Sequence, residues 1–232
     1  MQAQVQVQHS KHTRSKVPGM EGVVARWYAR MRGTAPQLAA YRTQAAQLTA
    51  GLRAGADVLE VAPGPGHLAI EMARRGFRVT GLDLSRSFVQ IASTSARQAG
   101  VSVDFRHGDA SNLPFADESF DLIVCQAAFK NFAQPVGALD EMCRVLRTAG
   151  TAIIQDMRHE ATQADIDQEV RRMQLGWLNG VMTRFTLRVL RLRAFSQVQF
   201  ERLAVQSAFG RCAVRSAGMS VEVRLTKKGR TP

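Results

Sequence analysis

The chain has 232 residues, a formal net charge of +12 at pH 7, 45% hydrophobic residues and 22% charged residues. This length suits one domain with a sizeable core, and the composition excludes a chain that is disordered throughout. No run approaches the roughly 18 consecutive apolar residues of a membrane span. The Gln-rich, cationic start also lacks the apolar stretch of a secretory signal. We therefore expect a cytoplasmic globular protein.

The charge is unevenly distributed: residues 1–56 carry a net +7, residues 57–170 a net −6 and residues 171–232 a net +11. Basic ends can attract acidic small molecules, nucleic acid or an anionic membrane face. A simpler interpretation is a solvated surface, since 26 of the 31 basic residues are arginine. The three cysteines, Cys125, Cys143 and Cys212, are too few and too widely spaced for a disulfide framework or a metal site, so we expect buried thiols and no metal.

Residues 1–20 have the composition of a disordered tail, and the domain is predicted to span 21–232. Two helices are expected in residues 21–56. The first begins near Glu21 and places Val24, Trp27, Tyr28 and Met31 at helical spacing. The second begins near residue 34 and ends before Gly51.

From residue 57 the pattern alternates between strands and helices. Strands are predicted at 57–62, 77–83, 101–107, 120–126 and 150–156, and helices at 66–75, 85–99 and 134–147. This order is typical of an α/β fold with a Rossmann-like, doubly wound, mostly parallel sheet. Two further strands, at 211–216 and 219–226, are predicted to form an antiparallel hairpin within 210–228, which makes seven strands.

The helical stretch 158–209 is longer than a simple crossover and is rich in arginine. We interpret it as an insertion that covers the ligand cleft. A basic amphipathic helix packed on the core is the simpler description, and a membrane-surface helix is a further alternative.

The core 57–157 is organised around the run Glu60-Val-Ala62-Pro-Gly64-Pro-Gly66, which follows an apolar strand and precedes a helix. Such a turn lets the backbone approach a nucleotide-like ligand, because glycine tolerates positive φ and the helix start offers free N–H donors. It indicates a ligand site without naming the ligand.

Three acids stand at the ends of successive predicted strands: Glu60, Asp83 and Asp109. Asp83 can accept hydrogen bonds from both hydroxyls of a ribose. Asp109 can accept from an exocyclic amine while the N–H of Ala110 meets a ring nitrogen. A single acid of this kind often only caps a helix, but three in order predict a nucleoside site.

These motifs resemble those of the class I S-adenosylmethionine (SAM) dependent methyltransferases over roughly residues 57–157. The glycine motif, Asp83, the run Gly108-Asp109-Ala110 and the later EMCRVLRTAG stretch stand in the family's order, although Ala62 replaces its first glycine. The resemblance implies SAM as cofactor, bound by Glu60, Ala62, Gly64, Gly66, Asp83, Leu84, Asp109, Ala110 and Gln126.

The N-terminal helix is also similar to that of the quinone-biosynthesis C-methyltransferase-like subgroup, in which an aromatic residue lies over the cofactor. Trp27 and Tyr28 are the matching residues, although ordinary packing would explain them equally well.

NAD is the alternative cofactor, because Gly64 to Ala69 also fits the dinucleotide pattern G-x-G-x-x-[GA] with Asp83 downstream. Glu60 would then face a pyrophosphate, whereas it suits the ammonium end of a methionine. Asp109 has no role in the dinucleotide pattern. Both features favour SAM.

Methyl transfer is an in-line displacement, so the protein mainly places the nucleophile roughly 3 Å from the methyl carbon and excludes water. A base is needed only if the acceptor must lose a proton. Tyr28 and His159 are the catalytic candidates, Lys130 could meet an anionic acceptor, and His67 is expected to be structural. Each of these is more often a packing or solvent-facing residue than a catalytic one.

The loop after the fourth predicted strand narrows the choice of acceptor. Its residues Cys125-Gln126-Ala127-Ala128 lack the Asn/Asp-Pro-Pro-aromatic signature of enzymes that methylate base or glutamine amines. We therefore expect a small organic acceptor, an anionic one included, methylated on O, N or C. The alternative is a methyltransferase, or a methyltransferase-like binder, that engages nucleic acid through the basic ends. The oligomeric state is not predicted.

Overall fold

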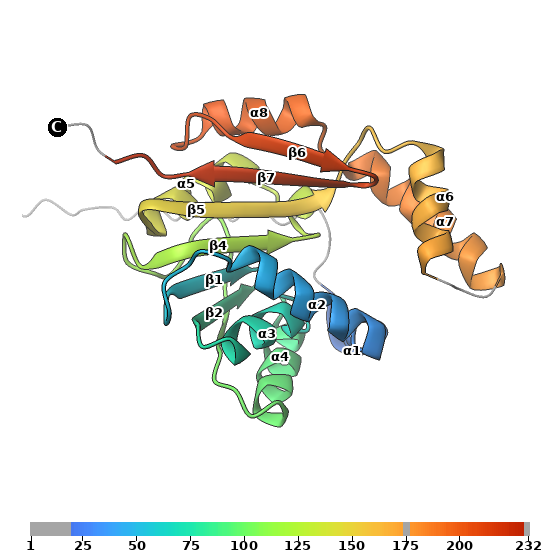
Figure 1. Ribbon diagram of the computed structural model, residues 1–232, viewed down its shortest axis with the longest axis horizontal. Coiled ribbons are helices and arrows are strands. Elements are labelled where there is room, and N and C mark those ends of the chain that lie inside the picture. The colour runs from blue at the N-terminus through green and yellow to red at the C-terminus, as the bar shows by residue number, and fades with distance from the viewer. Residues whose placement is uncertain (1–19, 174–176, 230–232) are drawn as a thin grey trace, which may run out of the picture.

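The computed structural model describes residues 20–173 and 177–229. The predicted disordered tail lies outside the described residues except for Met20. Seven strands form one sheet in the order β3-β2-β1-β4-β5-β7-β6 (Figure 1). The strands are β1 (Asp57–Val61), β2 (Arg78–Asp83), β3 (Asp104–His107), β4 (Phe120–Gln126), β5 (Leu146–Met157), β6 (Ala213–Ala217) and β7 (Ser220–Thr226).

The five strands β1 to β5 run parallel, whereas β7 pairs antiparallel with both β5 and β6. The predicted doubly wound sheet with a terminal antiparallel hairpin is therefore confirmed. Because the order reverses between β1 and β4, the carboxyl ends of these two strands flank the position where such folds bind ligands.

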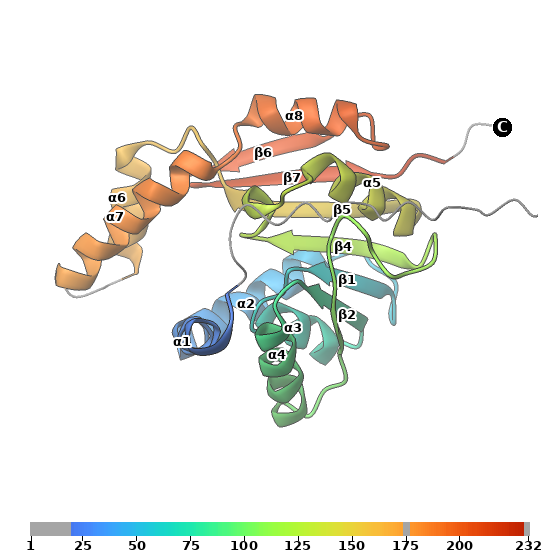
Figure 2. The same ribbon diagram turned by 180° about the vertical axis from the view of Figure 1, so that it is seen from behind.

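The described helices are α1 (Gly22–Arg32), α2 (Ala35–Leu48), α3 (His67–Arg74), α4 (Arg86–Gln98), α5 (Pro135–Val145), α6 (Gln163–Arg172), α7 (Trp177–Arg193) and α8 (Gln197–Gln206), with a short 3-10 turn at Phe129–Asn131. α2 and α3 pack on one face of the sheet and α5 and α8 on the other (Figures 1 and 2). None of the described helices is both long and apolar enough to cross a bilayer.

Alternate residues of the central strands enter two separate cores. Val58 and Val124 join the core under α2 and α3, whereas Leu59 and Cys125 join the core under α5 and α8. A strand points successive side chains to opposite faces, so a nearly continuous apolar run is needed to cover both. Cys125 and Cys143 are buried and Cys212 is half-buried, and all three thiols are free.

Several predicted boundaries differ from the structure, and β3, predicted at 101–107, spans only Asp104–His107. β5 begins at Leu146, four residues before the predicted start, because Leu146 already pairs with Phe120 before the register shifts. The described residues of the predicted helical stretch 158–209 form three helices, α6, α7 and α8. α8 packs on the sheet, while α6 and α7 project beyond the carboxyl end of β5 (Figures 1 and 2).

Candidate functional site

The glycine-containing turn after β1 has a backbone that only some residues adopt easily. Gly64 and Gly66 have φ of 54° and 79°, and Ala62, which is not glycine, has φ of 58°. A Cβ on Gly66 would lie 2.7 Å from the Phe105 ring and 2.8 Å from the Ala92 methyl, so this glycine is required by packing as well as by φ. A Cβ on Gly64 would meet nothing within 4 Å. Gly64 therefore leaves its backbone open to a ligand.

Asp83 is buried at the end of β2 and faces this turn. One of its carboxylate oxygens accepts from the Gly64 N–H at 2.9 Å and the other from the Ser85 N–H at 2.8 Å. Burial raises the pKa of Asp83 above its usual value. Each oxygen keeps a further lone pair, so the carboxylate is oriented and can still accept two hydroxyl donors.

A cavity of about 210 Å³ lies at the carboxyl ends of β1, β2 and β4. Seven of the nine predicted cofactor residues line it, together with the catalytic candidate Tyr28: Ala62, Gly64, Asp83, Leu84, Asp109, Ala110 and Gln126. We call it the nucleoside cavity. No described residue of 158–209 lines this cavity.

The two remaining cofactor residues lie beside it. Gly66 is the N-cap of α3. Glu60 lines a smaller pocket of about 40 Å³ that shares Ala62, Gly64, Gln126 and Tyr28 with the nucleoside cavity. We call this second space the Glu60 pocket.

Glu60 is only 2% exposed, and its Oε2 has no hydrogen-bond partner among the described residues. Burial raises the pKa of Glu60 to about 8, and the nearby Asp83 carboxylate acts in the same direction. The buried Nε2 of His67, in the same pocket, is also without a partner in the described structure. A buried acceptor without a donor is costly. The pocket is thus suited to a ligand group that donates hydrogen bonds and carries positive charge.

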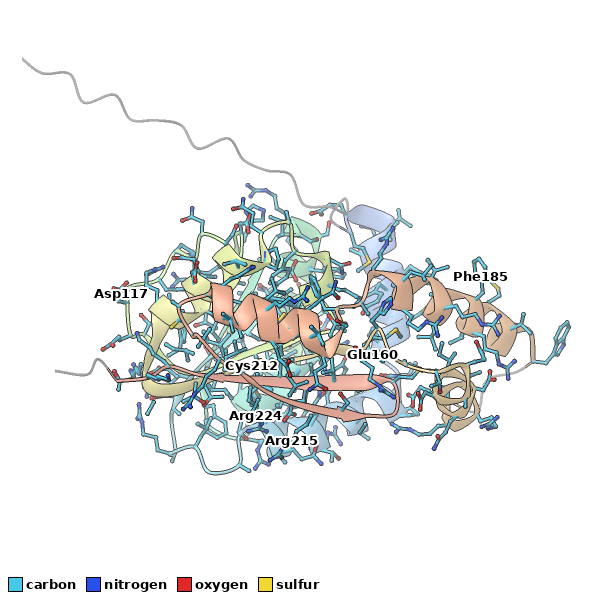
Figure 3. The ribbon with its side chains drawn as sticks, turned by 90° about the horizontal axis from the view of Figure 1, so that it is seen from above. Asp117, Glu160, Phe185, Cys212, Arg215 and Arg224 are labelled. Carbon is cyan, nitrogen blue, oxygen red and sulfur yellow. The ribbon has the colours of Figure 1, made fainter. Side chains whose placement is uncertain are left out.

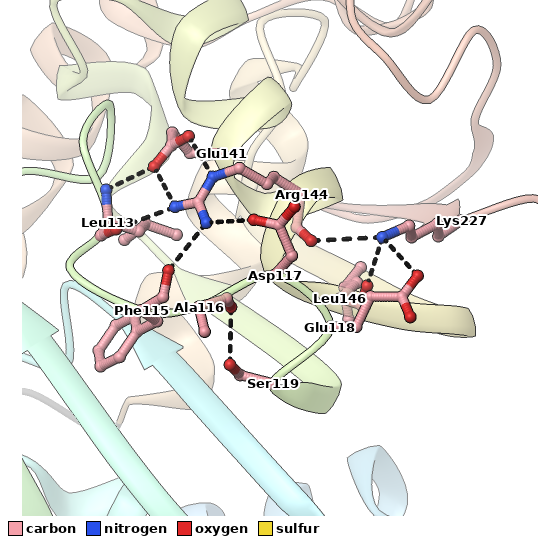
Figure 4. Close-up of polar contacts among 10 residues, drawn as sticks. All are labelled: Leu113, Phe115, Ala116, Asp117, Glu118, Ser119, Glu141, Arg144, Leu146 and Lys227. Carbon is pink, nitrogen blue, oxygen red and sulfur yellow. Dashed lines mark hydrogen bonds and ion pairs between the residues drawn. The ribbon is translucent and has the colours of Figure 1, made fainter.

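The loop that carries Asp109 and Ala110 is fastened from outside the cavity by α5. Arg144 donates to the backbone oxygens of Leu113 and Phe115 at 3.0 and 2.8 Å and pairs with the carboxylate of Asp117 (Figure 4). Glu141 accepts from the Leu113 N–H at 2.7 Å (Figure 4). The EMCRVLRTAG stretch therefore acts on the site indirectly, by fixing the loop after β3.

The matched family model is the methyltransferase domain, which covers residues 59–154. Residues 59–154 are therefore similar to a methyltransferase domain. Over 109 residues it is 37% identical to an uncharacterized methyltransferase, YcgJ, of Bacillus subtilis, covering 47% of this chain and 43% of that protein. Over 99 residues it is 37% identical to a demethylmenaquinone methyltransferase of Deinococcus radiodurans, covering 42% of this chain and 41% of that protein. The chain thus spans less than half the length of these relatives.

Solved structures share the fold well beyond the matched segment. A putative SAM-dependent methyltransferase of Methanococcus maripaludis superposes with a TM-score of 0.70 at 18% identity, covering 94% of this chain and 98% of that one. A SAM-dependent methyltransferase of Aquifex aeolicus gives a TM-score of 0.65 at 16% identity, covering 86% and 97%. At these identities the superpositions establish the fold, including the terminal hairpin.

The methyltransferase domain implies SAM as cofactor, and the buried groups are suited to it. The unpaired Oε2 of Glu60 matches the ammonium of a methionine, and Asp83 matches the hydroxyls of a ribose. Two buried carboxyl groups beside the turn offer no positive charge to the pyrophosphate of NAD.

The catalytic candidates have different positions. Tyr28 on α1 is partly buried, lines both cavities and packs edge-on against Phe88 at 5.8 Å between ring centroids. Its neighbour Trp27 is 58% exposed and lines neither cavity. His159 is exposed, with Nδ1 3.3 Å from the Arg191 carbonyl oxygen, and it is outside the lining of these cavities. Of the two catalytic candidates, Tyr28 and His159, only Tyr28 lines the cavity predicted to hold the cofactor.

Lys130 cannot meet an acceptor as the sequence suggested. Its ammonium is buried and lies 2.7 Å from both the Asp156 carboxylate and the Ala127 carbonyl oxygen. Asp156 also accepts from the Lys130 and Met157 N–H groups. The ion pair instead ties the turn after β4 to β5, and Ala127 in that turn has a φ of 54°.

A third, wider groove of about 590 Å³ adjoins the site over the open face of β5, β7 and β6. It shares Gln126 and Ala127 with both other cavities, and its wall includes Arg32, Gln155, Met157 and Arg215. We call it the Arg215 groove. Sequence reasoning missed it because its wall combines α1 with the distant hairpin, and no local pattern connects these segments.

Other missed residues close the nucleoside cavity from the side. Met20 and Ser85 are joined by a hydrogen bond from the Ser85 hydroxyl to the Met20 carbonyl oxygen at 2.7 Å, and both line the cavity. Glu21 accepts from the N–H groups of Arg86 and Ser87 at the start of α4. These contacts hold the start of α1 against α4, so that Tyr28 faces the cavity.

Within the described residues, no group of three or more His, Cys, Asp or Glu side chains is arranged to hold a metal ion.

Proposed function

We propose that this chain is a methyltransferase that transfers the methyl group of SAM to a small organic acceptor. The observation that carries the proposal is the unpaired Oε2 of the buried Glu60 beside the nucleoside cavity, together with the buried Asp83 that lines this cavity. Glu60 matches the ammonium group of SAM, and Asp83 matches the hydroxyls of its ribose. When bound, SAM supplies a methyl group that is already activated.

The chain's own residues then bind SAM, orient it and exclude water from it. Glu60 holds the methionine end, Asp83 the ribose, and Asp109 with Ala110 the adenine side. Tyr28 and Met20 close the cavity on the side of α1. Gln126 and Ala127 border all three spaces, so the turn after β4 is where an acceptor in the Arg215 groove comes nearest to the cofactor. Positioning of this kind supplies most of the rate enhancement in a displacement by an activated donor.

The Arg215 groove supports an acceptor that carries a negative charge. Arg32 borders both the groove and the Glu60 pocket, and Arg215 on β6 also lines the groove. Gln155 and Glu222 also line the groove, and the Gln155 side-chain amide donates to the Glu222 carboxylate at 2.8 Å. Arginines at the rim of a cleft suit a small anionic acceptor better than a nucleic acid, which needs a continuous basic stripe.

Calorimetric titration with SAM and, separately, with NAD tests the cofactor assignment. Asp83→Asn should weaken SAM binding by about 1–3 kcal/mol, the loss of charge-assisted hydrogen bonds. Asp104→Asn is the matched control, because Asp104 is an exposed carboxylate on β3 that pairs with Arg106. Equal affinity in the two variants would show that the ribose assignment is wrong.

A screen of metabolite pools for transfer of radiolabelled methyl from SAM tests the acceptor. Arg215→Gln should raise the KM for an anionic acceptor without changing SAM affinity, whereas Arg202→Gln, on the exposed side of α8, should change neither. Methylation of nucleic acid, or a KM that is unchanged in Arg215→Gln, would contradict the proposed acceptor site.

A further inference from the structure

Both tryptophans of the chain are exposed to solvent. Trp27 on α1 is 58% exposed and Trp177 at the start of α7 is 81% exposed. Tryptophan is usually well buried, so two exposed ones in one small domain need an explanation. The two helices lie at the edge of the sheet toward which β1 and β4 run (Figures 1 and 2).

Trp177 belongs to a mostly apolar face of α7, which Arg188 interrupts at about 20° from Trp177 around the helix. At 100° per residue, the exposed apolar side chains of this helix fall within an arc of about 140°. They are Trp177, Val181, Met182, Phe185, Val189 and Leu192, which together we call the α7 outer face. Phe185 is 68% exposed and lies on the part of the molecule that projects beyond the sheet (Figure 3). The other side of α7 packs on α6, where Gly180 approaches Val170.

The charges of α7 are all positive. Residues 177–193 contain four arginines and no acid. Arg184 pairs with Asp167, but Arg188 and Arg191 donate to neutral oxygens, those of the Gln163 side chain and the Ala161 carbonyl. The charge of these two arginines is therefore not neutralised by the groups they contact.

The other two carboxylates of α6 are already matched by arginines. Asp165 pairs with Arg158 and Glu169 with Arg172. The two-helix unit 163–193 carries six arginines and three carboxylates, a net of +3. An apolar face with arginines beside it and no acid on the same helix is the pattern of a helix that lies in the interface of an anionic bilayer.

We propose that the α7 outer face docks on an anionic lipid surface, with its aromatic and aliphatic side chains among the acyl chains and its arginines at the headgroups. A second copy of the chain is a poorer occupant, because pairing two such faces brings arginines of like charge together. Nucleic acid is also a poorer occupant, because phosphates offer nothing to Trp177, Phe185 and Leu192. The proposal does not depend on the proposed methyl transfer.

Docking by α7 would also turn the α1 side of the site toward the membrane. Trp27 is adjacent in sequence to Tyr28, which lines the nucleoside cavity from α1. α1 exposes Val23, Val24 and Met31 as well. We therefore expect α1 to supply a second, weaker contact.

Co-sedimentation of the full chain with vesicles tests the proposal. We expect binding to phosphatidylcholine vesicles that contain phosphatidylglycerol, at least tenfold stronger than to phosphatidylcholine alone, and weakened by high salt. In a Trp27→Phe variant, Trp177 is the only tryptophan, and its fluorescence should shift to the blue on binding and be quenched by brominated lipid. An unshifted emission would show that α7 does not enter the bilayer.

Phe185→Asp and Val205→Asp form a matched pair, because both replace an exposed helical apolar residue, 68% and 69% exposed, with the same charge. Phe185→Asp should weaken binding to anionic vesicles about tenfold or more, and Val205→Asp on α8 should leave it within twofold. Equal effects of the two substitutions would overturn the assignment to α7. So would light scattering that shows a lipid-free dimer dissociated by Phe185→Asp, or binding to duplex DNA that Phe185→Asp abolishes.

Discussion

Glu60→Gln should have opposite effects on two quantities: it should weaken cofactor binding and raise the stability of the cofactor-free protein. The Glu60 carboxyl is buried, and its pKa of about 8 exceeds the ordinary value of 4.5. In the unfolded chain it ionises above pH 4.5, whereas in the folded chain it keeps its proton up to about pH 8. Stability therefore falls as pH rises between these values, because the native state binds the additional proton.

The size of the effect is set by the linkage between protonation and folding. At pH 7 the unfavourable term is about 3 kcal/mol, since each pH unit above 4.5 contributes about 1.4 kcal/mol. A buried glutamine amide without full partners costs about 1 kcal/mol or more in return. Glu60→Gln should therefore stabilise the cofactor-free protein by about 1–3 kcal/mol at pH 7, with the difference disappearing near pH 5.

Cofactor binding should respond in the opposite direction. Binding of an ammonium requires Glu60 to ionise, so SAM affinity should rise up to tenfold per unit between about pH 6 and pH 8 and release close to one proton at pH 7. The amine of SAM, with an ordinary pKa of about 8, limits any rise above that pH. Glu60→Gln should remove this pH dependence and weaken SAM binding by about 1–3 kcal/mol near pH 8.

Thermal denaturation from pH 5 to pH 8.5 and calorimetry in two buffers of different ionisation enthalpy measure both effects. A Glu60→Gln variant that is less stable than the wild type at pH 8, or wild-type SAM binding without proton release at pH 7, would refute the reasoning.

Three further predictions concern the packing around the site. Gly66→Ala should lower the free energy of unfolding by about 2–4 kcal/mol in chemical denaturation, because of the positive φ and overpacking. Gly100→Ala is the control, since Gly100 also has a positive φ but a Cβ there would meet nothing within 4 Å. An equal loss in the two variants would contradict the role of packing at Gly66. Lys130→Met should lower the free energy of unfolding by about 3–5 kcal/mol at pH 7, because Asp156 is left buried without its cation. The loss should be smaller in the double variant that also carries Asp156→Leu. An equal loss in the single and double variants would refute the pairing. Ala62→Gly should raise the free energy of unfolding by up to about 1 kcal/mol or leave it unchanged. The substitution relieves the strain of a positive φ but gives the backbone of the unfolded chain more freedom. A large destabilisation would show that the Ala62 methyl is needed for packing.

The sequence predicted the sheet well because its signals are local. The central parallel strands β1 and β4 are apolar runs followed by a turn, and Asp83 and Asp109 stand at strand ends that the parallel topology brings to one edge. Seven of the nine residues predicted to bind the cofactor therefore line one cavity. Glu60 is predictable too, but its unpaired oxygen and raised pKa depend on burial that no sequence pattern measures.

The errors come from long-range packing. The sequence does not reveal the ion pair of Lys130, because its partner Asp156 lies 26 positions away on the neighbouring strand. The Arg215 groove joins α1 to the terminal hairpin and has no local signature. The cover predicted for 158–209 depends on which face each helix turns to the core, and a charge pattern alone does not specify that face. Tyr28 is expected within the first helix and His159 just past the fifth strand, and the sequence does not show that the packing of α1 on α4 brings only Tyr28 to the cavity.

Isothermal titration of the purified chain with SAM at pH 8, with NAD as the comparison, tests most directly whether the site between β1 and β2 binds SAM through Glu60 and Asp83. We predict saturable SAM binding at micromolar concentrations, weakened by Asp83→Asn and left unchanged by Asp104→Asn, and no binding of NAD. Absence of SAM binding at millimolar concentration, or NAD binding that Asp83→Asn abolishes, would contradict this assignment.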